Sequence, residues 1–181
     1  MSYISVVIFV RNEINNLITA INSIKNIAAE IIIISSNDNK DISIIADKYG
    51  GKLIFGKWRN DQQQKLIAEK SSENNWLLVL ESNEELSYEL QDEIEYIFAD
   101  KKQDRYSAYI IPFRSLVKDK MQPRFFAPVS KLLRLYDKTK NMSKKINNSY
   151  ELNGIAYQRL GNDNIKYKFK RFCTMVKSCF F

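Results

Sequence analysis

The sequence contains no histidine, and this absence excludes several kinds of site. Without an imidazole, neither a Ser-His-Asp triad nor a Cys-His pair can form, and no metal site can use histidine ligands. Cysteine is also scarce: Cys173 and Cys179 are too few and too close together for a disulfide framework. This use of cysteine indicates a reducing, cytoplasmic compartment.

Long hydrophobic runs are absent as well. No stretch reaches the ~20 apolar residues that a membrane-spanning helix needs. Ile4–Val10 is apolar but short, and no basic segment precedes it, so it predicts a strand and not a signal peptide. With 181 residues, 45% of them hydrophobic and 27% charged, the chain is expected to fold as one soluble domain.

Charge is divided unevenly along the chain. Residues 1–100 hold 9 Lys/Arg and 16 Asp/Glu, a net charge of −7, whereas residues 101–181 hold 19 and 5, a net charge of +14. A basic half attracts phosphate-rich partners: a nucleoside diphosphate, nucleic acid or the anionic inner face of a membrane. The alternative interpretation is a solvated, lysine-rich surface without a partner.

Apolar and amphipathic segments alternate through the first hundred residues. Short apolar runs predict buried strands at Ile4–Val10, Glu30–Ile34, Lys52–Phe55 and Trp76–Leu80. Helical spacing predicts the intervening helices, around residues 17–24, at Asp41–Tyr49 and Asp61–Lys70, and after a cap at Ser87. Strands joined through helices predict right-handed crossovers, and therefore a doubly wound, mainly parallel α/β sheet.

After about residue 105 this rhythm changes. Ser107–Pro112 and Lys131–Tyr136 predict strands, and a further strand pair is expected around Tyr150–Leu160. Residues 166–181 mix basic and aromatic side chains and are expected to form a tail.

Polar residues follow three of the predicted strands, at Arg11–Glu13, Ser35–Asp38 and Glu81–Glu85. In an open parallel sheet, ligands bind outside the carboxyl ends of the strands. Acidic residues directly after a buried strand are costly unless they are solvated, paired or bound to a cation such as Mg²⁺. The alternative is that Glu84 and Glu85 only favour the start of the next helix.

Taken in order, these segments resemble one family. Val10-Arg11-Asn12-Glu13 is similar to the opening of family-2 glycosyltransferases of the GT-A fold, and most of all to the subgroup that adds sugars to the lipopolysaccharide core. The similarity continues in register through Glu30, the Ser35–Lys40 turn, Tyr49-Gly50, Gln64-Lys65-Leu66, Trp76–Glu84, Pro128 and Leu133–Tyr136.

The resemblance implies a GT-A-like sheet in which the third strand is outermost, followed by the second, the first and the fourth. It implies a single domain over residues 1–165. Residues 1–105 would form the nucleotide-sugar-binding half and residues 106–165 the acceptor-side half.

The resemblance also implies a reaction. A sugar would pass with inversion from a nucleotide-sugar donor to a lipopolysaccharide, lipid-linked or other cell-envelope glycan acceptor, with Mg²⁺ or Mn²⁺ bridging the diphosphate. The implied residues are expected to meet at one concave edge: Asn12, Glu13, Ser35, Asp38 and Lys65 for the donor, and Glu81 and Asn83 for the metal. The general base is not identified, because Val129 and Ser130 replace the family's candidate carboxylate.

Several positions depart from the family pattern, and the C-terminal portion is expected to be shorter than in the family. Ser35 and Lys40 stand where the family has aspartates, and Leu66 replaces an asparagine. Glu81-Ser82-Asn83 replaces the Asp-x-Asp motif, so one carboxylate is lost. Because hard cations favour charged oxygen ligands, we expect the divalent metal to bind weakly or not at all unless a diphosphate is present.

Three hypotheses remain at this point. The first is an active glycosyltransferase with a relaxed site, which would use Glu81 with Asn83 or Glu84 for the metal. It would lie in the cytoplasm, in peripheral contact with the inner face of the membrane. The second is a catalytically inactive relative that acts as a binding module or is a remnant. The third is a basic nucleic-acid-binding domain, which we rank last because no recognised nucleic-acid-binding motif is present.

Overall fold

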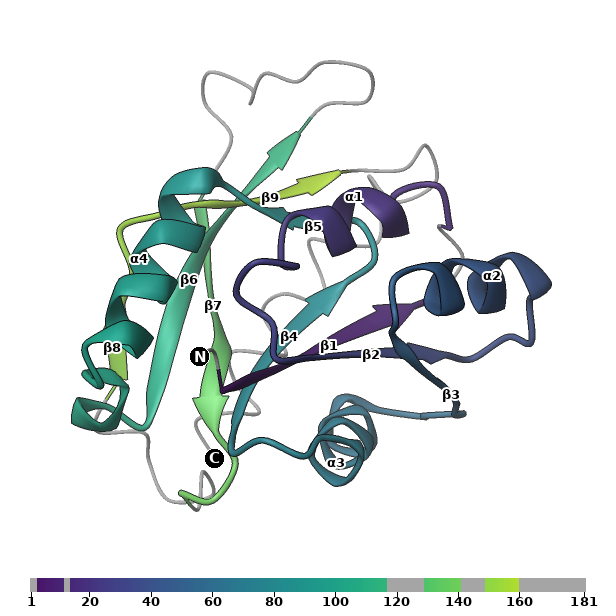
Figure 1. Cartoon of the computed structure of the whole chain (residues 1–181), viewed down its shortest axis with the longest axis horizontal. Helices are drawn as coiled ribbons and strands as arrows, with labels where there is room; N and C mark the ends of the chain where they lie inside the picture. The colour runs from purple at the N-terminus through teal and green to yellow at the C-terminus, as the bar shows by residue number, and fades with distance from the viewer. Residues whose placement is uncertain (1–2, 12–13, 117–128, 141–148, 160–181) are drawn as a thin grey trace.

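The computed structural model describes residues 3–11, 14–116, 129–140 and 149–159. Within them, strands and helices alternate up to β4 (Figure 1). The elements are β1 (Ile4–Val10), α1 (Leu17–Asn22), β2 (Glu30–Ser35), α2 (Lys40–Lys48), β3 (Lys52–Phe55), α3 (Asp61–Ser71), β4 (Trp76–Glu81), β5 (Glu84–Leu86), α4 (Tyr88–Ala99), a 3-10 helix (Gln103–Arg105), β6 (Ala108–Leu116), β7 (Val129–Asp137), β8 (Ser149–Glu151) and β9 (Ala156–Arg159).

All the strands belong to one sheet with the order β3-β2-β1-β4-β7-β6-β9-β5, and β8 pairs with β6. The first four strands are parallel, and this part confirms the predicted order of the third, second, first and fourth strands. Strand β7 then runs antiparallel to both β4 and β6. The sheet as a whole is mainly parallel, because β8 and β9 are again parallel to β6.

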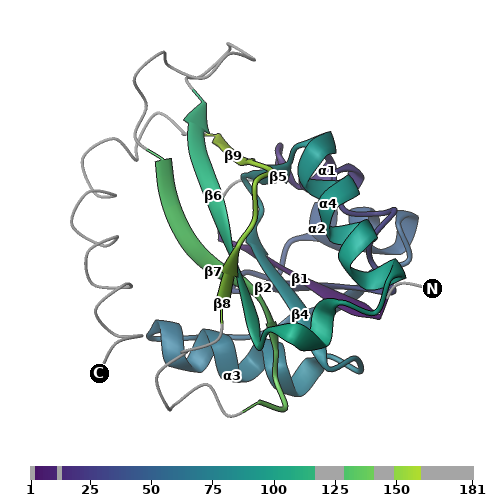
Figure 2. The same cartoon turned by 90° about the vertical axis from the view of Figure 1, so that its left-hand side faces the viewer.

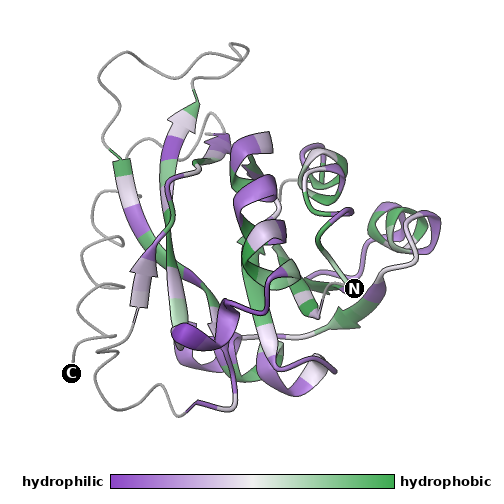
Figure 3. Cartoon of the chain, turned by 60° about the vertical axis from the view of Figure 1, so that its left-hand side comes forward, coloured by the Kyte–Doolittle hydropathy of each residue, from purple (hydrophilic) through white to green (hydrophobic). Residues whose placement is uncertain are grey.

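Helices cover both faces of the parallel part. Figure 2 shows α3 on one side of the sheet and α1, α2 and α4 on the other. Every residue of β1 is buried, and alternate side chains enter different cores: Val6 and Ile8 face the larger cluster, and Val7 and Phe9 face the smaller one. This explains why β1 is apolar at nearly every position, and Figure 3 shows hydrophobic colour along the central strands.

Local signals set several element boundaries. The side chains of Asn39, Asn60 and Ser87 accept hydrogen bonds from backbone N–H groups in the first turns of α2, α3 and α4. Ser87 was the cap predicted from the sequence. Gly50 has φ +64° just after α2, which confirms its predicted left-handed stop. None of the helices in the described residues is both long and apolar enough to span a membrane.

The structure departs from the predicted strand pair near Tyr150–Leu160 and from the alternative in which Glu84 and Glu85 start a helix. The segments near Tyr150–Leu160 do form strands, but β8 and β9 both pair with β6 and not with each other. Glu84 and Glu85 lie in β5, opposite β9, and do not begin a helix. The reason is long-range: Glu84 finds its partners on β7 and β9, which lie 50 and 74 residues later in the sequence.

Glu84 is the centre of a buried polar network. Its side chain is fully buried, and its carboxylate accepts hydrogen bonds from Arg134 at 3.1 Å and Gln158 at 3.1 Å. It also accepts one from the backbone N–H of Glu81 at 2.9 Å. The Arg134 guanidinium lies over the Phe113 ring, 5.6 Å from its centroid. The network therefore ties the end of β4 to β7, β9 and β6.

Removing only one of the two charged partners of this network should lower the stability of the protein. We expect Glu84→Leu or Arg134→Met alone to lower the free energy of unfolding by about 3–5 kcal/mol, because each leaves a buried charge uncompensated. The double variant should recover much of that loss, since no buried charge then remains unpaired. Urea unfolding of the two single variants and the double variant measures the coupling.

The matched control is Glu151→Gln, which breaks the exposed Lys131–Glu151 pair. Its cost should stay below about 1 kcal/mol. Strictly additive losses in the Glu84/Arg134 double variant would show that the two charges do not stabilise each other.

Gly154 lies between β8 and β9, where the backbone packs directly against α4. A Cβ at this position would lie 2.4 Å from Leu90 Cα, and the Gly154 N–H donates to Glu93 at 2.8 Å. We expect Gly154→Ala to lower the free energy of unfolding by about 1–3 kcal/mol, because backbone must move to admit the methyl group. Thermal unfolding measures the loss.

Gly56→Ala is the control for this glycine. Its Cβ would meet only ordinary contacts, Ile67 at 3.6 Å and Ile34 at 3.8 Å. Equal stability of the Gly154→Ala and Gly56→Ala variants would contradict the close approach of this segment to α4.

Candidate functional site

The carboxyl ends of β1, β2 and β4 lie level with one another. Val10 pairs with Ser35, and Phe9 pairs with Glu81. The backbone N–H of Ser82 donates to Phe9 at 2.9 Å and extends this ladder past the end of β4. Residues that follow these strands therefore meet at a single edge of the sheet, as the sequence predicted for Ser35 and Glu81.

A continuous string of polar contacts crosses this edge. The Ser35 hydroxyl donates to the Asn37 carbonyl at 2.7 Å and accepts from the Asn37 N–H at 3.2 Å. Asn37 Nδ2 donates to the Arg11 carbonyl at 3.3 Å. The Arg11 guanidinium then pairs with the Glu81 carboxylate at 3.3 Å. We call Ser35, Asn37, Arg11 and Glu81 the edge string.

Other predicted site residues lie differently. Asp38 is exposed in the connection between β2 and α2. Asn12 and Glu13 lie outside the described residues. Asn83 is largely buried, and its Nδ2 donates to the Arg159 carbonyl on β9 at 2.8 Å. Its backbone carbonyl accepts from the Arg159 N–H at 2.8 Å, so both ends of Asn83 are held by β9.

Lys65 lies on α3, which covers the face of the sheet opposite to α1, α2 and α4 (Figure 2). Its ammonium is 3.7 Å from the Glu69 carboxylate and 5.2 Å from the centroid of the Tyr136 ring. Burial raises the pKa of Tyr136 above its ordinary value, so the phenol under Lys65 is neutral. Among the described residues, none of these Lys65 contacts is with Ser35 or Glu81.

The described residues at this edge do not fit a divalent metal ion. In the part of the chain that the structure describes, no three Asp, Glu, Cys or His side chains are grouped closely enough to form a metal site by themselves. A metal here would depend on one or two carboxylates together with the diphosphate. Glu84 is buried in its own network, and Asn83, whose Nδ2 donates to β9, can offer a metal only a neutral amide oxygen. Glu81 offers one carboxylate, and that carboxylate already faces a guanidinium.

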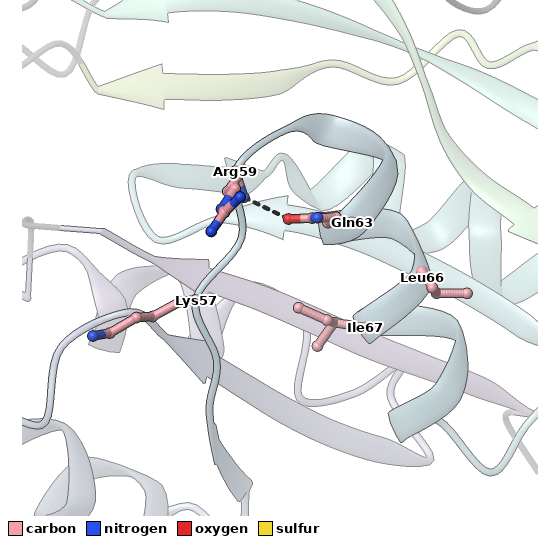
Figure 4. Close-up of a pocket in the computed structure, with 5 residues that line it drawn as sticks. All are labelled: Lys57, Arg59, Gln63, Leu66 and Ile67. Atoms are coloured by element: carbon pink, nitrogen blue, oxygen red, sulfur yellow. Dashed lines mark hydrogen bonds between the residues drawn. The ribbon is translucent and has the colours of Figure 1, made fainter.

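A pocket of about 520 Å³ opens beside the edge string, between the end of β3 and α3 (Figure 4). Two cations, one amide and two apolar side chains line it: Lys57, Arg59, Gln63, Leu66 and Ile67. Gln63 Oε1 accepts from the Arg59 N–H at 2.8 Å and holds the connecting loop against α3.

The pocket adjoins the end of β2, because the Gly56 N–H donates to Ser35 at 3.0 Å. Sequence reasoning missed Lys57 and Arg59. The signal that could have identified them is their place, directly after the third predicted strand. Trp58 between them packs edge-on against Phe9 of β1, with centroids 5.2 Å apart.

Curated proteins of Rickettsia are similar to most of this chain. An uncharacterized glycosyltransferase of Rickettsia conorii is 45% identical over 135 residues, which cover 75% of this chain and 48% of that protein. One of Rickettsia typhi is 39% identical over 179 residues, covering 89% and 61%. The chain thus spans about half to three-fifths of the length of these relatives. No protein-family model matches the sequence.

Solved glycosyltransferases share the architecture. S. aureus TarS in complex with UDP-GlcNAc has a TM-score of 0.62 at 11% identity, over 99% of this chain and 65% of that one. Glucosyl-3-phosphoglycerate synthase from Mycobacterium tuberculosis, in complex with Mn²⁺, UDP and phosphoglyceric acid, has a TM-score of 0.64 at 11% identity, over 98% and 78%. The chain therefore has the GT-A fold, as expected from its sequence, and is similar in sequence to rickettsial proteins named as glycosyltransferases.

Proposed function

We propose that this chain binds a nucleotide-sugar at the edge string and transfers its sugar, with inversion, to a cell-envelope glycan such as lipopolysaccharide. The observation that carries the proposal is the edge string itself, polar contacts that join the carboxyl ends of three adjacent parallel strands. In open α/β sheets this is the edge where ligands bind. The GT-A fold and the rickettsial relatives support a sugar donor as that ligand.

The charges around the edge suit a diphosphate. Arg11 lies in the edge string, and Lys57 and Arg59 line the adjacent pocket. A leaving diphosphate gains negative charge as its bond to the sugar breaks, and fixed cations stabilise that charge. Within this proposal, Asn12, Glu13, Ser35, Asp38 and Lys65 remain the candidate donor-binding residues named from the sequence.

The proposed reaction is a single displacement. An acceptor hydroxyl loses its proton and forms a new C–O bond at the anomeric carbon. The bond between that carbon and the diphosphate breaks, and the nucleoside diphosphate leaves with the electron pair. Residues 106–165 would provide the acceptor side, and we assign no general base. The net charge of +14 over residues 101–181 supports peripheral contact with an anionic membrane surface on the cytoplasmic side.

A second candidate function is a nucleotide-sugar-binding module without turnover. The pairing of Glu81 with Arg11 favours it, since Glu81 is the acidic side chain of the edge string and this contact neutralises it. The two candidates share the donor site and differ only in whether the bond to the sugar is broken.

The donor site is tested by calorimetric titration with UDP-, GDP-, ADP- and dTDP-sugars, with and without Mn²⁺. We expect one of these donors to bind. The Lys57→Ala/Arg59→Ala variant should bind it about threefold to tenfold more weakly, because two cations beside the diphosphate are lost. Lys131→Ala, which removes a cation from an exposed ion pair on β7, is the control and should bind as the wild type does.

Release of nucleoside diphosphate, followed with envelope glycan as the acceptor, separates the two candidates. Binding with release supports the transferase, and binding without release supports the module. Failure of every donor to bind would contradict both.

A further inference from the structure

We propose that Arg11, and not a divalent metal ion, neutralises the donor diphosphate at this edge, and that Glu81 positions the Arg11 guanidinium for that contact. The inference rests on the proposed function and deepens it. It starts from the disagreement between the described residues and a metal site: the sequence position where a metal would be held contains an ion pair.

The groups that would be expected to hold a metal are engaged elsewhere. Glu84 accepts hydrogen bonds from Arg134, Gln158 and the Glu81 N–H while its side chain is fully buried. The Asn83 amide donates to the Arg159 carbonyl on β9. Recruiting the Glu84 carboxylate as a ligand would leave a buried polar partner unsatisfied, which costs more than the lost hydrogen bond alone. Asn83 could offer a metal only its neutral amide oxygen, which is a weaker ligand for a hard cation than a carboxylate.

The backbone of Arg11 is fixed at the edge of the sheet, whereas its side chain is partly exposed to solvent. Its carbonyl accepts from Asn37, and it directly follows the fully buried strand β1. Its side chain is 41% exposed, and within the described part of the chain its one hydrogen bond goes to Glu81. A guanidinium has five N–H donors in a planar fork, so donors remain for a bidentate phosphate contact.

The pair is neutral as a whole, but its cation is the more exposed member: the Arg11 side chain is 41% exposed and the Glu81 side chain 19%. A metal ion would have to approach the Arg11 guanidinium and compete with it for one carboxylate. A diphosphate is instead attracted by Arg11, and it need not break the contact with Glu81, because that carboxylate engages only one nitrogen of the guanidinium. A fixed cation of this kind requires no metal to offset the charge of the leaving group.

The test is calorimetric titration of nucleoside diphosphates into the full chain, in EDTA and in Mn²⁺. UDP, GDP, ADP and dTDP are the probes, and the tightest is carried forward. We expect the wild-type affinity in EDTA to lie within about twofold of that in Mn²⁺. Arg11→Ala should weaken binding by at least about tenfold in both buffers, and Arg11→Lys by less, since it keeps the charge but loses the fork.

Glu81→Gln separates positioning from metal binding. If Glu81 held a metal, this variant would lose only the binding that depends on Mn²⁺. If Glu81 instead positions Arg11, the Glu81→Gln variant should change the affinity for the diphosphate by the same factor in EDTA and in Mn²⁺. Lys131→Ala is the control for the loss of a positive charge. Unchanged thermal unfolding of each variant is the control for folding.

The outcomes are distinct. Binding that appears only with Mn²⁺, or an Arg11→Ala variant that binds like the wild type, overturns the inference and leaves the proposed function standing. Failure of every diphosphate to bind in either buffer contradicts the donor site itself.

Discussion

The buried Glu84–Arg134 contact is the interaction on which the arrangement of the sheet depends. It lies where the parallel strands meet the antiparallel ones, and Glu84 also binds the Glu81 N–H at the end of β4. The same carboxylate therefore joins the two halves of the sheet and fixes the backbone from which the Glu81 side chain reaches Arg11. A buried polar network of this kind specifies one packing, because any other packing would leave a charge buried without a partner.

Much of the parallel half could be predicted because its determinants are local. Strand β1 is covered on both faces, so it is apolar at nearly every position, and that pattern is visible without any partner. Ser87 caps α4, and Gly50 takes the left-handed conformation after α2, for reasons contained in a few residues of sequence. Alternation of strand and helix then leaves few topologies, and the resemblance to the glycosyltransferase family selected the order β3-β2-β1-β4 among them.

The candidate site was less predictable because its contacts join distant residues. Arg11 and Glu81 are 70 positions apart, and nothing local to either residue indicates the pair. Asn83 follows Glu81 by two residues, yet its side chain is held by a different strand. It directly precedes β5, and its Nδ2 donates to the Arg159 carbonyl on β9, the partner of β5. The Lys65 ammonium lies over the Tyr136 ring of β7, a contact that no local pattern in the sequence indicates. The contacts of Asn83 and Lys65 depend on strands that follow residue 128.

The pairing of the strands also bears on how the chain folds. Strands β1, β2 and β3 pair within about fifty residues of sequence, whereas β5 meets β9 only after a loop of about seventy residues has closed. Closing that loop orders many residues before it gains contacts, so β1, β2 and β3 should pair before β5 and β9 do. In a growing polypeptide, the nascent chain would then hold a partly formed sheet whose β4 edge remains unpaired until β7 is synthesised.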